Sequence, residues 1–294
     1  MGQVLERNKS TTFKNESSLF NKTQDYGLSE NAYSCGYSLR LKYSSFLQDT
    51  IDWFSSNCSG LLPVVAPKVL SLGCGSGIFD LEFIKIIQQQ IINDSAKLDF
   101  TGLDFNMTDL EYFRERLSNQ SHLTQSSVTL KYQKFEPLTD LNDSYDLITM
   151  VHFLHSFDDV LPIIKTALRH LKADGKLLIV QQKNGSISEL KDAFLDILPN
   201  QKFHSTDHVK ELLLSENINY TSHRIDTNFD VSIMKNTSLD TLLLMSFCLC
   251  NDLTILNTQQ QNQIRNAFLS LAKIQHDGSA LISESMEALV LQQV

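Results

Sequence analysis

The sequence predicts an α/β fold, in which strands and helices alternate around a mostly parallel sheet. Two observations carry this prediction. Residues 69–72 form a short apolar strand pattern that runs directly into a glycine-rich turn and then into a helical pattern. Residues 145–151 are apolar almost throughout, which is typical of a strand buried on both faces. Strands that alternate with helices pair in parallel through right-handed crossovers, so these segments belong to one sheet.

The composition is that of a globular protein with one well-filled core. The chain has 294 residues, of which 42% are hydrophobic and 20% are charged, and this length does not require two domains. Its formal net charge is −9, and no run of Lys or Arg is longer than two residues. We therefore expect no nucleic-acid partner, because phosphate binding needs a concentrated basic patch.

The sequence has no segment of about twenty apolar residues and no apolar signal core near its start. We therefore expect no membrane partner and a cytoplasmic protein. The five cysteines include no CxxC pair, which favours reduced thiols and argues against a metal site.

The amino-terminal part divides into a tail and a helical segment. Residues 1–28 are polar and rich in Ser, Asn and Lys, so we expect a mobile tail before a single domain over residues 29–294. Within residues 29–66, apolar side chains such as Tyr37 and Leu41 recur at helical spacing. This spacing predicts one or two helices before the first strand.

Three glycines at alternate positions, Gly73, Gly75 and Gly77, shape the turn after the first strand. Glycine lets the backbone turn tightly, leaves no Cβ in the way of a ligand and aims the amides of the next helix at it. The GxGxG spacing differs from the dinucleotide GxGxxG motif and from the P-loop. A second strand ends at Asp104, whose carboxylate is suited to accept hydrogen bonds from both hydroxyls of an adenosine ribose. These four residues predict one nucleotide-type site.

The rest of the chain continues the alternation of elements. We expect helices over residues 81–91, 108–117, 159–171, 188–198 and 206–215, and strands over residues 98–104, 128–132, 145–151, 177–180 and 219–225. Two more helical patterns, at residues 239–249 and 259–273, precede an apolar last strand at residues 286–291. We expect this last strand to enter the edge of the sheet as a hairpin partner.

At the glycine turn and Asp104 the chain resembles the class I S-adenosylmethionine-dependent methyltransferases, whose first motif has this spacing and whose second strand ends in an acid. The resemblance extends over about a hundred residues, because a long helix, a charged turn at Gly175 and an aliphatic strand repeat that family's order. It implies a Rossmann-like class I methyltransferase fold, with a mostly parallel seven-stranded sheet, an antiparallel last strand and an α-helical insertion before it. It also implies S-adenosyl-L-methionine as cofactor and S-adenosyl-L-homocysteine as product.

The implied cofactor site lies at the glycine turn and at the ends of the second, third and fourth strands. Phe135 and Glu136 follow the third strand, where an adenine ring would lie. The complete set of implied cofactor-binding residues is Gly73, Gly75, Gly77, Asp104, Phe105, Asn106, Phe135, Glu136 and Val151.

Residues 150–234 resemble histamine N-methyltransferase and related small-molecule methyltransferases more closely. The stretch MVHFLHSFDDVLPIIKTALRHLKADGKLLIV carries this resemblance. It implies that residues 29–66 form a helical cap over the site. It also implies that residues 227–280 form a helical insertion that sets substrate specificity.

This resemblance places His152 and Glu284 as catalytic residues, with Tyr37, His155 and Gln182 as candidates for substrate binding. The implied reaction is methyl transfer by in-line displacement to a nitrogen of a small amine or imidazole, in a protein that we expect to be a monomer. The Glu284 carboxylate would pair with a substrate ammonium or imidazolium, and His152 would accept or orient a proton.

Two alternatives remain open from the sequence. The first is a methyltransferase of the same fold that acts on a hydroxyl or a carboxylate of a small metabolite. The second is a binding protein that has kept the fold and lost turnover.

Overall fold

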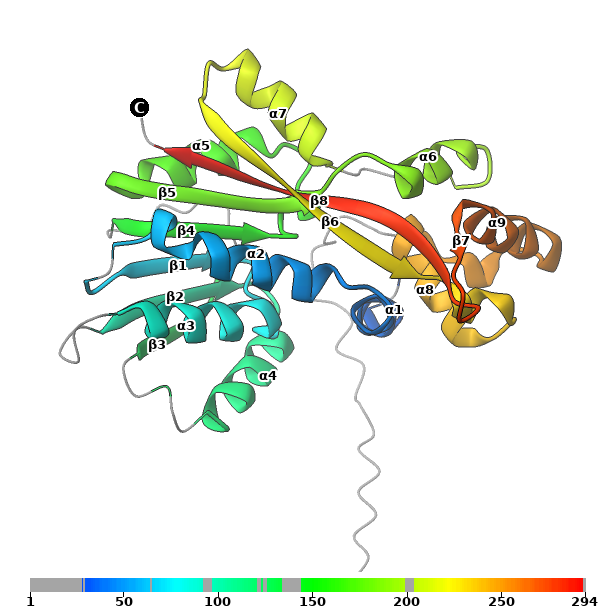
Figure 1. Cartoon of the computed structure of the whole chain (residues 1–294), viewed down its shortest axis with the longest axis horizontal. Helices are drawn as coiled ribbons and strands as arrows, with labels where there is room; N and C mark the ends of the chain where they lie inside the picture. The colour runs from blue at the N-terminus through cyan, green and yellow to red at the C-terminus, as the bar shows by residue number, and fades with distance from the viewer. Residues whose placement is uncertain are drawn as a thin grey trace, which may run out of the picture.

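A mixed sheet forms the centre of the molecule. The computed structural model describes residues 28, 30–63, 65–91, 97–120, 123, 126–133, 144–198 and 204–292. Over these residues the sheet has eight strands, in the order β3-β2-β1-β4-β5-β8-β6, with β7 paired to β8 (Figure 1). The strands are β1 Lys68–Leu72, β2 Leu98–Asp104, β3 Ser126–Tyr132, β4 Tyr145–Val151, β5 Leu171–Gln182, β6 Tyr220–Asp230, β7 Lys273–Ile274 and β8 Ala280–Gln292.

The fold-class prediction is confirmed, since β1 to β5 pair in parallel and β8 is antiparallel to its neighbours. The predicted place of the last strand is wrong, because β8 lies between β5 and β6 instead of at the edge. A mostly apolar run fits this inner place: residues 286–289 of β8 are buried. β6 takes the edge, where its first half can expose polar side chains to water. The two-residue β7 is a strand that the sequence did not predict.

Helices cover both faces of the sheet (Figure 1). Their bounds are α1 Glu30–Lys42, α2 Phe46–Leu61, α3 Ile78–Gln90, α4 Met107–Ser118, α5 Leu161–Arg169, α6 Ser186–Ala193, α7 Thr206–Ser215, α8 Leu239–Leu249 and α9 Thr258–Leu271. Apolar residues of α2, α3 and α4 form one core with the sheet, and those of α5 and α7 form a second core on the other face. The amino-terminal segment is therefore two helices, of which α2 belongs to a core layer.

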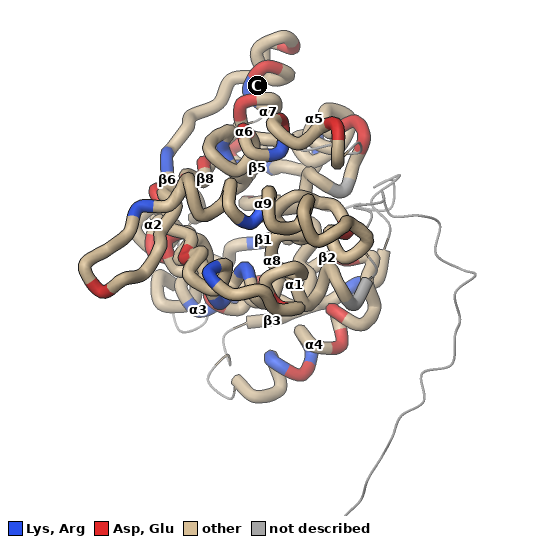
Figure 2. The backbone as a smooth tube through the Cα atoms, turned by 90° about the vertical axis from the view of Figure 1, so that its right-hand side faces the viewer, with Lys and Arg blue, Asp and Glu red and all other residues tan. Residues whose placement is uncertain are grey.

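A third core lies beyond the sheet and joins the insertion to the rest of the molecule. It combines apolar residues of α6, α8 and α9 with Phe229 of β6 and Ile282 of β8. Helix α1 packs against α8 so closely that a Cβ on Gly36 would lie 2.6 Å from the Cβ of Phe247. Figure 2, which views the molecule along the strands, shows α1, α8 and α9 in front of the sheet. These helices therefore lie at the end of the sheet where β1 and β4 finish (Figure 1).

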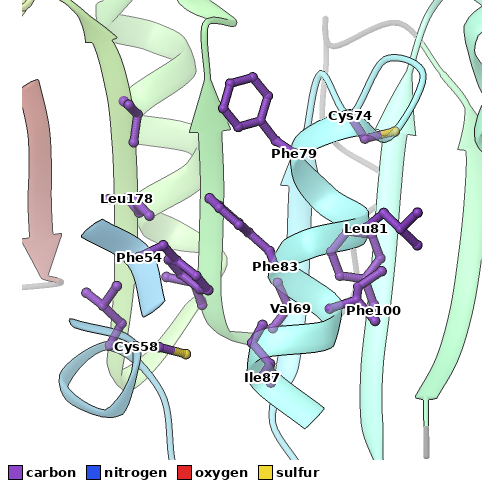
Figure 3. Close-up of a cluster of buried hydrophobic side chains, with 14 of the residues drawn as sticks. Phe54, Cys58, Val69, Cys74, Phe79, Leu81, Phe83, Ile87, Phe100 and Leu178 are labelled. Atoms are coloured by element: carbon purple, nitrogen blue, oxygen red, sulfur yellow. The ribbon is translucent and has the colours of Figure 1, made fainter. Parts of the chain in front are cut away.

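We predict that Phe54→Ala destabilises the fold by about 4 kcal/mol, because a large buried ring is lost and leaves a cavity. Phe54 is fully buried, and its ring stacks on that of Phe83 with centroids 3.9 Å apart (Figure 3). Chemical unfolding measures the change. Tyr112→Ala is the matched control, since Tyr112 is 54% exposed and its loss should change stability by at most about 0.5 kcal/mol. Equal effects of the two variants would contradict this account of the core.

Candidate functional site

The loop between β1 and α3 is held against the end of β2 by its backbone. The amides of Gly73 and Cys74 both donate to the carbonyl oxygen of Leu103, over 2.9 and 3.1 Å. Gly73, Gly75 and Gly77 have φ values of 74°, 50° and 73°, in the left-handed region that favours glycine. The alternating glycines therefore produce the tight turn that the sequence predicts.

The three glycines differ in what a side chain would meet. A Cβ on Gly73 would lie 2.4 Å from the ring of Phe153, and one on Gly77 would lie 2.1 Å from the ring of Phe113. A Cβ on Gly75 would meet no described atom within 4 Å. Gly73 and Gly77 are thus required for packing, whereas Gly75 leaves the loop open to a ligand.

Asp104 joins this loop to the second strand. One carboxylate oxygen accepts a hydrogen bond from the amide of Gly75 at 2.7 Å, and the other accepts from the amide of Asn106 at 2.8 Å. Burial raises the pKa of Asp104, and these amides oppose the rise. Because a carboxylate oxygen can accept more than one hydrogen bond, both oxygens retain capacity for two hydroxyl donors. Gly75 and Asp104 therefore lie together, as the sequence predicts.

The other predicted cofactor residues are placed as follows. The Asn106 side chain caps α4, accepting from the amides of Thr108 and Asp109. Phe105 is half-buried against the second core, and Val151 is the half-buried last residue of β4. Phe135 and Glu136 lie outside the described residues. The cofactor roles of these five residues stay predictions.

His152 follows β4 in a strained backbone conformation, with φ of 50°. Its ring packs against those of Phe46 and Phe79, with centroid distances of 5.1 and 6.1 Å. Burial, and then the charge of Arg40, lower the pKa of His152 to about 4, so the imidazole is neutral near pH 7. Its Nε2 atom is buried and has no hydrogen-bond partner among the described residues. Phe79 begins the helix that follows the glycine loop, so His152 lies near that loop.

His155 lies one turn further on, in the short 3₁₀ segment Leu154–Ser156. Burial, followed by the charges of His152, Lys191 and His204, lowers the pKa of His155 to about 3. Both predicted histidines are therefore neutral at neutral pH. A substrate role for His155 remains a prediction.

Glu284 does not offer the free carboxylate that the sequence led us to expect. It lies within β8, and one of its oxygens forms a buried ion pair with Arg40 of α1. Its other oxygen accepts from the Gln182 side chain at 2.8 Å. A substrate ammonium would have to compete with these partners, which corrects the expected pairing.

Arg40 is a site residue that the sequence reasoning missed. Its guanidinium lies over the ring of Phe229, 3.9 Å from the centroid, and the residue is 6% exposed. The sequence signal for Arg40 was its position three residues after Tyr37, in a helix that also carries Leu41. An arginine among such apolar residues indicates a buried partner, because Arg is rarely fully buried without one. That partner, Glu284, is 244 residues away, and the sequence does not reveal the contact.

Tyr37 and Asp80 show that α1 lies close to the glycine loop. Burial, then the charges of Asp109 and Asp80, raise the pKa of Tyr37. Asp80, in the first turn of α3, is 5% exposed, and burial raises its pKa to about 7 although a hydrogen bond with Ser71 opposes the rise. Asp80 is not among the residues that the sequence predicts to be functional.

Comparison with known proteins identifies the family. Residues 41–222 match a family model described as a methyltransferase domain. The chain belongs to this family. Methyltransferases of this class use S-adenosylmethionine as methyl donor, so the predicted cofactor is the one that the family implies.

Two curated relatives support the assignment. The chain is 25% identical over 171 residues to demethylmenaquinone methyltransferase of Lactococcus lactis, covering 56% of this chain and 61% of that protein. It is 28% identical over 151 residues to the methyltransferase YcgJ of Bacillus subtilis, covering 51% and 53%. The chain thus spans less than two thirds of the length of these relatives.

Solved structures share the fold. The crystal structure of YcgJ from Bacillus subtilis has a TM-score of 0.53 at 15% identity, covering 78% of this chain and 94% of that one. The plantazolicin methyltransferase BpumL, solved with S-adenosylhomocysteine (SAH), has a TM-score of 0.51 at 13% identity, covering 92% and 94%. By their names, a quinone and a plantazolicin methyltransferase differ in substrate, so family membership does not identify the methyl acceptor.

Other features of the molecule do not involve the predicted site residues. A hollow of about 560 Å³ borders α6 and α9, and no residue predicted from the sequence to be functional lines it. None of the described helices combines the length and apolar character needed to cross a bilayer.

We predict that Gly77→Ala destabilises the protein more than Gly75→Ala, by about 2 kcal/mol. Both positions have positive φ, so the backbone strain of the two variants is similar. Only at Gly77 must a buried ring, that of Phe113, move to admit the methyl group. Urea unfolding of both variants measures the difference, and equal losses would show that Phe113 does not constrain the loop.

We predict that Asp80 lowers stability as pH rises from about 4 to about 7. Its pKa is higher in the folded protein than in the unfolded chain, so folding takes up a proton in this range. The free energy of unfolding of the wild type should therefore fall relative to that of Asp80→Asn, by roughly 4 kcal/mol at most. Urea unfolding at several pH values measures it. Loss of the Ser71 hydrogen bond would change the free energy of unfolding of Asp80→Asn by the same amount at every pH. Wild-type and variant profiles that run parallel across this pH range would contradict the prediction.

Proposed function

We propose that this chain is an S-adenosylmethionine-dependent methyltransferase that methylates a nitrogen of a small amine or imidazole. The observation that carries the proposal is the contact between Gly75 and Asp104. An open backbone position and a carboxylate at the end of the neighbouring strand together suit a nucleoside whose sugar hydroxyls need acceptors.

The cofactor fits the residues present. Asp104 would accept hydrogen bonds from the ribose hydroxyls, and the loop at Gly75 would lie under the ligand without a side chain in the way. The family assignment and the BpumL structure with SAH support this choice. When bound, S-adenosylmethionine supplies a methyl group that its sulfonium has already activated.

The remaining work of the protein is to bind the acceptor and to orient its nucleophilic nitrogen. Holding the nucleophile in line with the methyl group accounts for most of the rate that such a site can provide. His152 is neutral near pH 7 and has a buried Nε2 free of described partners, so it is suited to accept a hydrogen bond from the attacking nitrogen and to orient it. Gln182 and Glu284 then act mainly by holding Arg40 in place, and no covalent protein nucleophile is required.

Transfer to a carboxylate or hydroxyl oxygen is the second candidate. Buried Arg40 favours it, because a guanidinium would hold a carboxylate beside the methyl donor. A binding protein without turnover would keep Gly75 and Asp104 and methylate nothing.

The single-domain organisation, the monomeric state and the cytoplasmic location remain predictions from the sequence.

We predict that Asp104→Ala weakens S-adenosylmethionine binding about 100-fold, because two charge-assisted hydrogen bonds are lost. Calorimetry measures the affinity. Asp99→Ala is the matched control, since Asp99 lies near the start of the same strand beside Lys68. Thermal unfolding of each variant checks that the fold is retained. Unchanged affinity in folded Asp104→Ala would remove the cofactor assignment.

We predict that a panel of small amines, imidazoles, acids and alcohols yields N-methylated products, identified by mass spectrometry. His152→Asn should lower kcat about 100-fold, because the imidazole that positions the attacking nitrogen is lost. His276→Asn, on an exposed turn, should leave kcat unchanged. Methylation on oxygen alone would overturn the preference for nitrogen. Cofactor binding without any methyl transfer would support the alternative of a binding protein without turnover.

A further inference from the structure

Three buried polar groups near the end of β4 lack hydrogen-bond partners within the described part of the chain. They are Nη1 of Arg40, Nε2 of His152 and the hydroxyl of Thr227. Leaving such a donor or acceptor unpaired in the interior costs about 1 to 3 kcal/mol. Several unpaired groups at one place in a fold therefore indicate that a bound ligand completes their hydrogen bonds.

These groups lie together. The ring of Phe46 is 5.1 Å from the ring of His152 and 5.8 Å from the Arg40 guanidinium. Thr227 is the partner of Glu284 across the β6–β8 pair, so the two side chains share a face of the sheet. Since Glu284 pairs with Arg40, all three groups border one region between α1, β4 and β8.

The charges of this region disfavour a cation. Glu284 is the carboxylate in direct contact with Arg40, and both of its oxygens already accept hydrogen bonds, from Arg40 and Gln182. Arg40 cancels its charge, and His152 is neutral. The guanidinium would therefore repel an ammonium that approached Nη1, whereas an anionic oxygen would satisfy this donor.

The guanidinium is also held rigidly. Phe229 supports its face, and the ion pair with Glu284 fixes Nη2. A donor that is fixed before the ligand arrives loses little conformational entropy on binding, and a guanidinium matches the geometry of a carboxylate.

We propose that the methyl acceptor carries a carboxylate, which binds Nη1 of Arg40 while the acceptor's nucleophilic nitrogen faces Nε2 of His152. This inference rests on the proposed function and narrows its substrate class to small anionic nitrogen compounds. Arg40 is then a specificity-determining residue, contributed by α1, and Thr227 offers a hydroxyl to the same ligand.

The test compares three ligands that share an imidazole ring: imidazole-4-acetate, 4-methylimidazole and histamine, whose ring substituents carry a carboxylate, no charge and an ammonium. Calorimetry with the full chain, saturated with SAH, measures their affinities. Imidazole-4-acetate should bind at least about tenfold more tightly than 4-methylimidazole, as expected for one charge-assisted hydrogen bond, and histamine should bind no more tightly than 4-methylimidazole. Equal affinities, undetectable binding of all three, or a preference for histamine would overturn the proposal.

Two variants separate the anion site from structural effects. Glu284→Gln keeps the Arg40 charge and should retain or increase the preference for imidazole-4-acetate. The double variant Arg40→Gln/Glu284→Gln removes both charges without leaving either one buried alone, and it should abolish the preference while thermal unfolding confirms a folded protein. A preference that survives in the folded double variant would overturn the role of Arg40.

Methyl transfer is read separately, by incubating each ligand with S-adenosylmethionine and analysing the products. Carboxylate preference without transfer would support the anion site and overturn the proposed reaction. Transfer to histamine with no carboxylate preference would support the reaction and overturn the anion site.

Discussion

The hydrogen bond from the Gly75 amide to the Asp104 carboxylate connects the ends of two strands, and the rest of the site is arranged around it. β1 and β2 are parallel neighbours, so the loop after one and the acid ending the other meet at the same edge. The rings of Phe153 and Phe113 fill the space beside Gly73 and Gly77. These packed rings therefore support the loop at Gly73 and Gly77, and Gly75 is the glycine of the loop that a ligand can approach.

The acceptor side of the site is built from segments that are distant in sequence. α1 contributes Arg40, the turn after β4 contributes His152, and β8 contributes Glu284. They meet because α1 packs closely on α8, where Gly36 admits Phe247, and because β8 runs between β5 and β6 (Figure 1). The helical insertion thus fixes the position of α1, and α1 positions the buried guanidinium.

Local burial governs the electrostatics of this site more than the net charge does. The chain carries a net charge of −9, yet the group beside His152 is a cation. Burial favours the neutral forms of His152 and Asp80, whose pKa values move in opposite directions because one is a base and the other an acid. A site with few free charges suits the proposed transfer to nitrogen, because that reaction needs a neutral nucleophile.

The sequence by itself determined the α/β order, the glycine turn and Asp104, because each depends on local patterns: alternation, apolar runs and glycine spacing. The resemblance to a methyltransferase family pointed to His152 after the buried fourth strand, and its catalytic role stays a prediction. Only the tertiary structure decided that β8 lies inside the sheet, that Gly73 and Gly77 serve packing, and that Glu284 is paired with Arg40. These features depend on contacts between residues up to 244 positions apart, and no local pattern encodes which distant side chain neutralises a buried charge.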